Sequence, residues 1–422
     1  MTNYNTVSSN LKRGIVNFSE RISRGLTRPE SKFISQMIYG ILSAQSCHLS
    51  KIARELSENI TLKKVIDRLS RNLGSFENAD FLFMNYIKKV KGALSDKTLL
   101  VVDGGDITKP CSKKMEHMAR VHDGSTGGTG DGYWTLAVTA LTSERKMPIG
   151  VYTRVYSQAE PDFISEDEEV LKALNFLSRN FKRKNIRVFD RGYDANIYYE
   201  RLTDKRESFV IRAKKNRSVI YKGVRVNIMS LAKSFKGKYS LKFNKKNGME
   251  ADLKISVIPV RLPCRPDTEL NLVMCYGFGQ EPLLLLTNLR SDDKRISIVI
   301  TKVYILRWRI EEFYRFKKQQ FDFEDFRVRS LKSIRNLDLL LTIAIGYIGL
   351  MSEKGDEYRM KMELIEVSKR IKGVPKFTFY AMADGMHFIL AKTGKGIGEL
   401  IRPKPKTMQL SLFDFPHLCW SG

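Results

Sequence analysis

The sequence predicts an α/β protein: a helical region, then a sheet of buried strands, then a mostly helical C-terminal region. Three observations lead to this fold class. The first hundred residues carry apolar side chains at helical spacing. Two short apolar runs, at 98–103 and 186–190, read as strands buried on both faces, and each ends in an aspartate. Several further strand-like runs between residues 214 and 289 indicate a β-rich insertion.

Composition narrows the function classes. The chain has 422 residues, is 42% hydrophobic and carries a net charge of +27. A positive field of this size predicts a polyanionic partner, with double-stranded DNA or RNA ahead of an anionic membrane surface. The longest apolar run, Leu339–Met351, is shorter than the roughly 20 residues that span a bilayer, and the first residues are polar. We therefore expect a cytoplasmic protein with no membrane span.

Cysteine and histidine usage points away from zinc and disulfides. The five cysteines include no CxxC pair, and the five histidines show no HxxxH or HxH spacing. Any metal in this protein is therefore expected on oxygen ligands.

The region 1–97 is predicted to be helical and to bind DNA. Two short amphipathic segments, 49–59 and 61–73, are joined by a tight polar turn, with Thr61 as an N-cap. The outer face of the second segment carries the basic residues Lys63, Lys64, Arg68 and Arg71. The pair resembles a helix-turn-helix, which would place the second helix in a major groove. The alternative is an ordinary helical hairpin.

The first candidate site residue is Asp103. It ends the apolar run that begins at Thr98, and Gly104 and Gly105 are expected to break the strand at once. A carboxylate at the end of a buried strand has a fixed backbone and a side chain open to solvent, which suits a metal ligand. Asp106 is the competing candidate, beyond the glycine turn.

The next stretch is expected to be structural. The glycine-rich segment 124–132 has no Lys-Ser or Lys-Thr after its glycines, so it does not fit a phosphate-binding loop. The runs 133–142 and 147–157 predict a hairpin of two strands. A helix from Ser165 to about Asn180 follows, with an acidic first turn.

The second candidate is Asp190, which ends the short apolar run Ile186–Phe189. Asp194 is predicted to cap the next helix, and Arg212 lies in the strand-like run after it. From Asp190 to Glu311 the chain runs 121 residues, far more than the about 2–6 residues of an ordinary strand-to-helix loop. A β-rich insertion at about 214–289 accounts for this length.

A helix is predicted from Tyr304 to Lys318, because this stretch holds neither Pro nor Gly. At about 100° per residue, an apolar stripe faces the core and a polar stripe lies beside it. The polar stripe comprises Tyr304, Arg307, Glu311 and Lys318. The alternative interpretation is an exposed ion-pair ladder from Arg307 to Glu311.

The order Tyr, two residues, Arg, three, Glu, six, Lys resembles the helix signature of the DDE transposases of insertion sequences, in the branch named for insertion sequence four. The resemblance implies a ribonuclease H-like catalytic domain over 98–351, with a basic C-terminal region at 352–422. It also implies that Asp103, Asp190 and Glu311 are the catalytic metal ligands. Tyr304, Arg307, Lys318 and Arg212 would contact DNA phosphates. Gly105 departs from the family's usual Asp-Gly-Thr or Asp-Thr-Thr.

This resemblance implies a function and its partners. Three carboxylates would hold two Mg²⁺ ions, for which Mn²⁺ can substitute, to cut DNA at the ends of an element and transfer the strands. A hairpin intermediate, a synaptic homodimer cutting in trans and a nucleoid location would accompany this chemistry. Two alternatives stay open: a Mg²⁺-dependent nuclease without strand transfer, and a DNA-binding protein that has kept a transposase scaffold without catalysis.

The tail contains a second short motif. Residues 409–413 read QLSLF, which resembles the pentapeptide by which bacterial replication and repair proteins bind the β sliding clamp. In that motif the contacts would come from Gln409, Leu410, Leu412 and Phe413. Pro403 and Pro405 disfavour a helix just before it. The alternative is that these apolar residues pack on the protein's own core.

Overall fold

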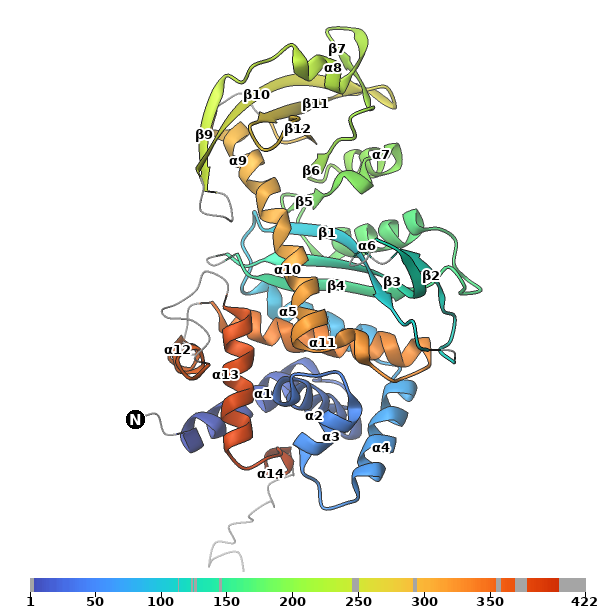
Figure 1. The fold of residues 1–422 in the computed structure, drawn as a ribbon, viewed down its shortest axis with the longest axis vertical. Helices are drawn as coiled ribbons and strands as arrows, with labels where there is room; N and C mark the ends of the chain where they lie inside the picture. Colours follow the sequence, from blue (N-terminus) through green and yellow to red (C-terminus); the bar gives the residue numbers. More distant parts are fainter. Residues whose placement is uncertain are drawn as a thin grey trace, which may run out of the picture.

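The computed structural model describes residues 4–112, 114–122, 124, 127–143, 146–244, 250–290, 294–353, 358–368 and 378–401. The protein has three parts along its longest axis: the inserted strands at one end, the core sheet in the middle, and the N- and C-terminal helices at the other end (Figure 1).

The core sheet has strand order β4-β3-β1-β5-β6, with β2 on the edge of β3. The bounds are β1 (Leu99–Thr108), β2 (Ala119–His122), β3 (Thr129–Leu141), β4 (Pro148–Tyr156), β5 (Ile186–Phe189) and β6 (Phe209–Arg212). Strands β1, β3 and β4 are antiparallel neighbours, whereas β5 and β6 run parallel to β1. The parallel strands need crossovers, which α6 (Glu166–Asn180) and α7 (Asn196–Asp204) provide. This order and these directions confirm the ribonuclease H-like fold.

The β-rich insertion extends the same sheet. Its elements are β7 (Ser218–Tyr221), β8 (Val224–Asn227), α8 (Ile228–Lys233), β9 (Tyr239–Asn244), β10 (Glu250–Leu262), β11 (Arg265–Tyr276) and β12 (Leu283–Thr287). Strand β12 pairs antiparallel with β6, and β11 and β10 follow. The insertion is therefore joined to the catalytic sheet by backbone hydrogen bonds and does not hang from a flexible linker.

Helices fill the opposite end of the molecule. The N-terminal ones are α1 (Tyr4–Ile22), α2 (Arg28–Ala44), α3 (Leu49–Leu56), α4 (Leu62–Ser75) and α5 (Ala79–Lys91). The buried helix α11 (Leu331–Met351) lies between the sheet and α2 and α4, because it contacts β4 on one side and these helices on the other (Figure 1). Helix α5 contacts α11 too, but it also reaches the sheet, where Tyr86 donates a hydrogen bond to the Gly150 carbonyl oxygen at 3.0 Å. Sequence explains where α2 begins: Thr27 and Glu30 form a capping box.

Helix α11 is long and apolar enough to cross a membrane, so the run-length argument made from Leu339–Met351 does not hold for the helix as it folds. However, 89% of its most apolar window is buried inside the protein. Its apolar side chains pack in the core against β4 and the N-terminal helices.

The stretch predicted as one helix is a helical rod with two irregular turns. Helix α9 (Lys294–Ile305) leads into a 3₁₀ turn at Leu306–Trp308, then α10 (Arg309–Arg315) and a π-helical turn at Phe316–Gln320. The rod starts against strands of the insertion, crosses the core sheet and ends near α11 (Figure 1).

The described part of the C-terminal region is mostly helical, as predicted. It contains α12 (Tyr358–Val367), α13 (Phe379–Lys392) and the short α14 (Gly398–Ile401). Helix α13 was not predicted from the sequence. The clamp-like motif with Gln409, Leu410, Leu412 and Phe413 lies outside the described residues.

Candidate active site

Asp103 and Asp190 lie side by side on neighbouring parallel strands. The β1–β5 ladder pairs Val101 with Val188 and Val102 with Phe189. One step further in the same register brings Asp103 opposite Asp190, where the parallel pairing stops. Strand β5 ends at Phe189, so Asp190 is the first residue beyond the strand.

One prediction about this strand is wrong: Gly104 and Gly105 do not break it. Strand β1 continues to Thr108 and stays paired with β3 through both glycines. The glycines are needed for close packing instead. A Cβ on Gly105 would lie 3.2 Å from the ring of Tyr314, whose hydroxyl donates a hydrogen bond to the Asp103 carbonyl oxygen at 2.8 Å.

The rod brings Tyr304, Arg307 and Glu311 over the two aspartates. Arg307 donates from Nη1 to Asp103 Oδ2 at 3.0 Å and from Nη2 to Glu311 Oε1 at 2.7 Å. The ion-pair ladder along the rod therefore exists, but its arginine also bridges to the sheet. The Tyr304 hydroxyl donates to Asp190 Oδ1 at 3.0 Å.

Arg212 reaches the same site from β6. Its Nη1 lies 3.9 Å from Asp190 Oδ1, a long ion pair between two partly exposed side chains. Three carboxylates and two guanidinium groups thus converge from β1, β5, β6 and the rod.

Lys318 faces a different carboxylate pair. It bonds Asp106 Oδ2 at 3.1 Å and Glu324 Oε1 at 3.0 Å. Asp106, the alternative first aspartate, is therefore paired with Lys318 at the far end of the rod, whereas Asp103 faces Arg307. Glu324 was not foreseen because it follows the π-helical turn.

The pKa values of Asp103 and Asp190 are shifted in opposite directions. Burial raises the pKa of Asp103 to about 7, and the charges of Asp190 and Glu311 add to this against the opposing charge of Arg307. Burial also acts to raise the pKa of Asp190, but hydrogen bonds from the Arg191 backbone and Tyr304, with the charges of Arg307 and Arg212, hold it below its ordinary value.

The donor set suits a hard divalent cation. All three groups are carboxylates, the ligand type that Mg²⁺ prefers, and the side chains of Asp103, Asp190 and Glu311 are 20%, 36% and 50% exposed, so an ion can reach them. In the described part of the chain, no three His, Cys, Asp or Glu side chains are close enough to hold an ion as they stand. Here the carboxylates of Asp103 and Glu311 are spread around the guanidinium of Arg307.

Two further residues belong to this neighbourhood. Tyr314 fixes the Asp103 backbone, and its position seven residues after Arg307 and three after Glu311 is helical spacing that could have revealed it. Asp194 is not the predicted helix cap. Ala195 takes that position, while buried Asp194 accepts from Tyr199 at 2.7 Å and from the Lys214 backbone at 2.6 Å, anchoring the start of the insertion.

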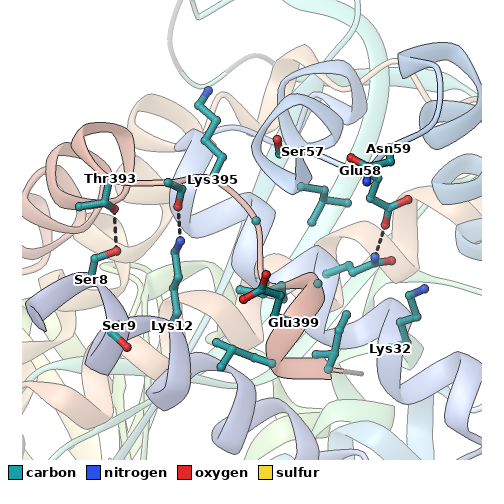
Figure 2. Close-up of a pocket in the computed structure, with 18 of the residues that line it drawn as sticks. Ser8, Ser9, Lys12, Lys32, Ser57, Glu58, Asn59, Thr393, Lys395 and Glu399 are labelled. Carbon is teal, nitrogen blue, oxygen red and sulfur yellow. Dashed lines mark hydrogen bonds between the residues drawn. The ribbon is translucent and has the colours of Figure 1, made fainter. Parts of the chain in front are cut away.

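A cavity of about 990 Å³ lies away from this site, between α1, α2, the loop after α3 and residues 393–401 (Figure 2). Its charged lining is mixed: Lys12 and Lys395 are bonded to Gly394 O and to Glu55, and Glu58 and Glu399 also face it.

Comparisons with known proteins agree with this geometry. A family model described as "Transposase DDE domain" matches residues 94–346, more than half of the chain. No curated protein matches significantly.

Two solved structures are similar to the chain. A piggyBac transposase synaptic complex with hairpin DNA matches at a TM-score of 0.47 and 10% identity, over 95% of this chain and 84% of that one. The NurA nuclease from Sulfolobus solfataricus matches at a TM-score of 0.26 and 11% identity, over 58% and 86%. Both TM-scores are below 0.5, so the assignment rests on the family match. On that basis the chain belongs to the DDE transposases, enzymes that cut and transfer DNA with divalent metal ions.

Proposed function

We propose that this transposase binds the ends of its own insertion sequence, cuts the DNA there in a Mg²⁺-dependent reaction and transfers the freed strands to a target. The observation that carries this proposal is the convergence of Asp103, Asp190 and Glu311 from two parallel strands and the rod that crosses them. Arg307 bonds Asp103 and Glu311, and Tyr304 bonds Asp190.

The three carboxylates would hold two Mg²⁺ ions, with Mn²⁺ as a substitute. When bound, such ions stabilise the charge that develops on the attacking and leaving oxygens of a phosphodiester. Asp103 and Asp190 are suited to this because β1 and β5 fix their backbones side by side. Glu311 arrives from α10 and is half exposed, so it can adjust to the substrate.

The donors around the carboxylates would position the phosphates. Arg212 and Arg307 can each present a planar fork of N–H groups to a phosphate. Burial raises the pKa of Tyr304 to about 12, so at neutral pH its hydroxyl keeps the proton it donates. Although burial acts to lower the pKa of Lys318, the charges of Glu324 and Asp106 raise it, so the side chain is cationic at neutral pH and can bind a DNA phosphate.

The rest of the chain would hold the DNA ends. In the candidate helix-turn-helix, Lys63, Lys64 and Arg71 are exposed on α4, whereas Arg68 bonds Glu58 and Gln36 and is not available to DNA. The net charge of +27 favours long-range attraction to duplex DNA. The proposal includes a hairpin intermediate, a synaptic homodimer cutting in trans, a cytoplasmic, nucleoid-associated location and docking of the tail motif on the β sliding clamp.

The test is a cleavage assay on DNA carrying the chain's own genomic flanks. Asp103→Asn, Asp190→Asn and Glu311→Gln should each reduce Mg²⁺-dependent nicking at least about a thousandfold, because each removes a metal ligand. Binding to the same DNA should be largely kept. Glu312→Gln is the matched control, since Glu312 is the next residue on α10 and pairs with Arg315.

Each outcome has a defined meaning. Nicking that survives one of the three substitutions would remove that residue from the site. Nicking without joined strand-transfer products, in the presence of target DNA, would instead identify a nuclease.

A further inference from the structure

Arg307 holds the two carboxylates that a metal ion would need. Its Nη1 bonds Asp103 and its Nη2 bonds Glu311, and its side chain is only 13% exposed. These are charge-assisted hydrogen bonds, so each places a positively charged donor against an oxygen that an ion would use.

We propose that Arg307 is a built-in competitor of the divalent metal, which leaves the carboxylates for a DNA phosphate when metal and substrate load together. The inference rests on the proposed function, because it takes Asp103 and Glu311 as metal ligands. It goes beyond that function in making metal affinity depend on one arginine.

The charges around the site support competition. When all three carboxyl groups are ionised, as metal ligation requires, Asp103, Asp190 and Glu311 carry three negative charges, and Arg307 with Arg212 supplies two positive ones. A divalent ion entering beside the guanidinium would meet strong repulsion from a cation within a few ångströms in a partly buried site. Moving Arg307 away removes that repulsion and frees one oxygen on each of two carboxylates.

The surroundings allow the movement. Arg307 lies in the 3₁₀ turn between α9 and α10, its side chain is partly exposed, and its partner Glu311 is half exposed. A phosphate offers it the same bidentate geometry as a carboxylate. DNA bound across the site therefore gives Arg307 an alternative partner, and by linkage it should strengthen metal binding.

If Arg307 competes with the metal, the enzyme without DNA should bind metal weakly, and removing the guanidinium should strengthen binding. In full-length protein without DNA, Arg307→Gln should bind Mn²⁺ roughly tenfold more tightly than wild type, within the usual range of coupling between sites. Free Mn²⁺ measured by electron paramagnetic resonance during a titration gives this affinity directly. Arg307→Lys keeps one positive charge without the fork, and we expect an affinity between those of Arg307→Gln and wild type.

Two controls make the result specific. Arg315→Gln removes the same charge from the same rod at an ion pair with Glu312, and should leave Mn²⁺ affinity unchanged. Asp103→Asn should weaken Mn²⁺ binding in both the wild-type and the Arg307→Gln background, which locates the ion at the triad.

The outcomes separate this inference from the proposed function. If Asp103→Asn weakens Mn²⁺ binding while both Arg307 variants match or fall below wild type, the competition is wrong and the metal site stands. If Mn²⁺ binding is insensitive to Asp103 in every background, both ideas fall. Circular dichroism of each variant checks that it is folded.

Discussion

At the residue scale, two chemically identical side chains acquire opposite properties. Asp103 is the more buried and faces two carboxylates, whereas Asp190 accepts hydrogen bonds from Tyr304 and the Arg191 backbone. Neutralising contacts favour the ionised form of Asp190, and burial favours the protonated form of Asp103. An apo site with one carboxyl group protonated near neutral pH carries less repulsion among its carboxylates.

The pKa of about 7 at Asp103 has a consequence for stability without metal. Between about pH 4, where an unfolded Asp titrates, and pH 7, the folded protein holds a proton that the unfolded chain releases. The stabilising contribution is complete below that window and is lost as pH rises through about 7. Asp190 does not interfere, because its lowered pKa moves its own effect to more acid pH.

The measurement is urea unfolding in EDTA at pH 5 and pH 8. We expect the wild type to lose more stability over this interval than Asp103→Asn, which cannot titrate. Equal losses in the two proteins would show that Asp103 has an ordinary pKa.

At the element scale, the irregular turns of the rod decide which way its side chains point. The π-helical turn directs Lys317 into the core, where it bonds Asp338 on α11 and Thr342, while Lys318 reaches Asp106 and Glu324. A regular helix wheel treats the rod as uniform and cannot place these two lysines. Such turns often occur at functional sites.

The contact between the rod and β1 depends on Gly105. A methyl group there would lie 2.9 Å from Thr135 Oγ1 and 3.2 Å from the Tyr314 ring, so Thr135 must shift and the Tyr314 ring must move slightly, which disturbs the hydrogen bond from Tyr314 to Asp103. We expect Gly105→Ala to cost about 1–3 kcal/mol of unfolding free energy and to slow nicking.

The cost is read from the urea midpoint, and the rate from the cleavage assay. Gly279→Ala, where an added Cβ meets nothing within 4 Å, is the control and should change neither. If Gly105→Ala behaves like the control, the rod does not depend on this close approach.

At the scale of the whole molecule, one continuous sheet links the insertion to the catalytic core. Strand β12 returns from the insertion to pair with β6, and the chain then enters α9, whose rod delivers Glu311. The rod therefore begins against strands of the insertion, and near its end Lys317 bonds Asp338 on α11. Contacts at both ends of the rod therefore help to position Glu311.

The tail prediction also belongs to this scale, because it concerns a partner of the whole enzyme. A peptide spanning residues 407–416 should bind purified β sliding clamp with micromolar affinity, typical of a short peptide that orders on binding. A peptide with Gln409→Ala and Phe413→Ala should not bind. Titration followed by fluorescence anisotropy tests this, and equal binding by both peptides, or by neither, would overturn clamp docking.

The sequence by itself was sufficient for the fold class, and it also singled out Asp103, Asp190 and Glu311 as the proposed metal ligands, which the cleavage assay tests. This worked because buried parallel strands are apolar throughout and because the helical pattern of the rod is local. The insertion was predictable for two reasons: the 121 residues from Asp190 to Glu311 are too many for a loop, and they contain several strand-like runs. Helix α13 was missed, and the expected cap at Asp194 was wrong, because tertiary contacts decided both.

Only the tertiary structure decided which charges meet. Asp103 and Arg307 are 204 residues apart in the chain, and Lys318 and Asp106 are 212 apart, so neither pair has a local signal. The continuation of β1 through Gly104 and Gly105 likewise depends on tertiary structure. Glycine has a low strand propensity, and here both glycines are paired with residues of β3. Sequence periodicity gives the direction of a side chain along its own element, whereas its partner depends on how the elements pack.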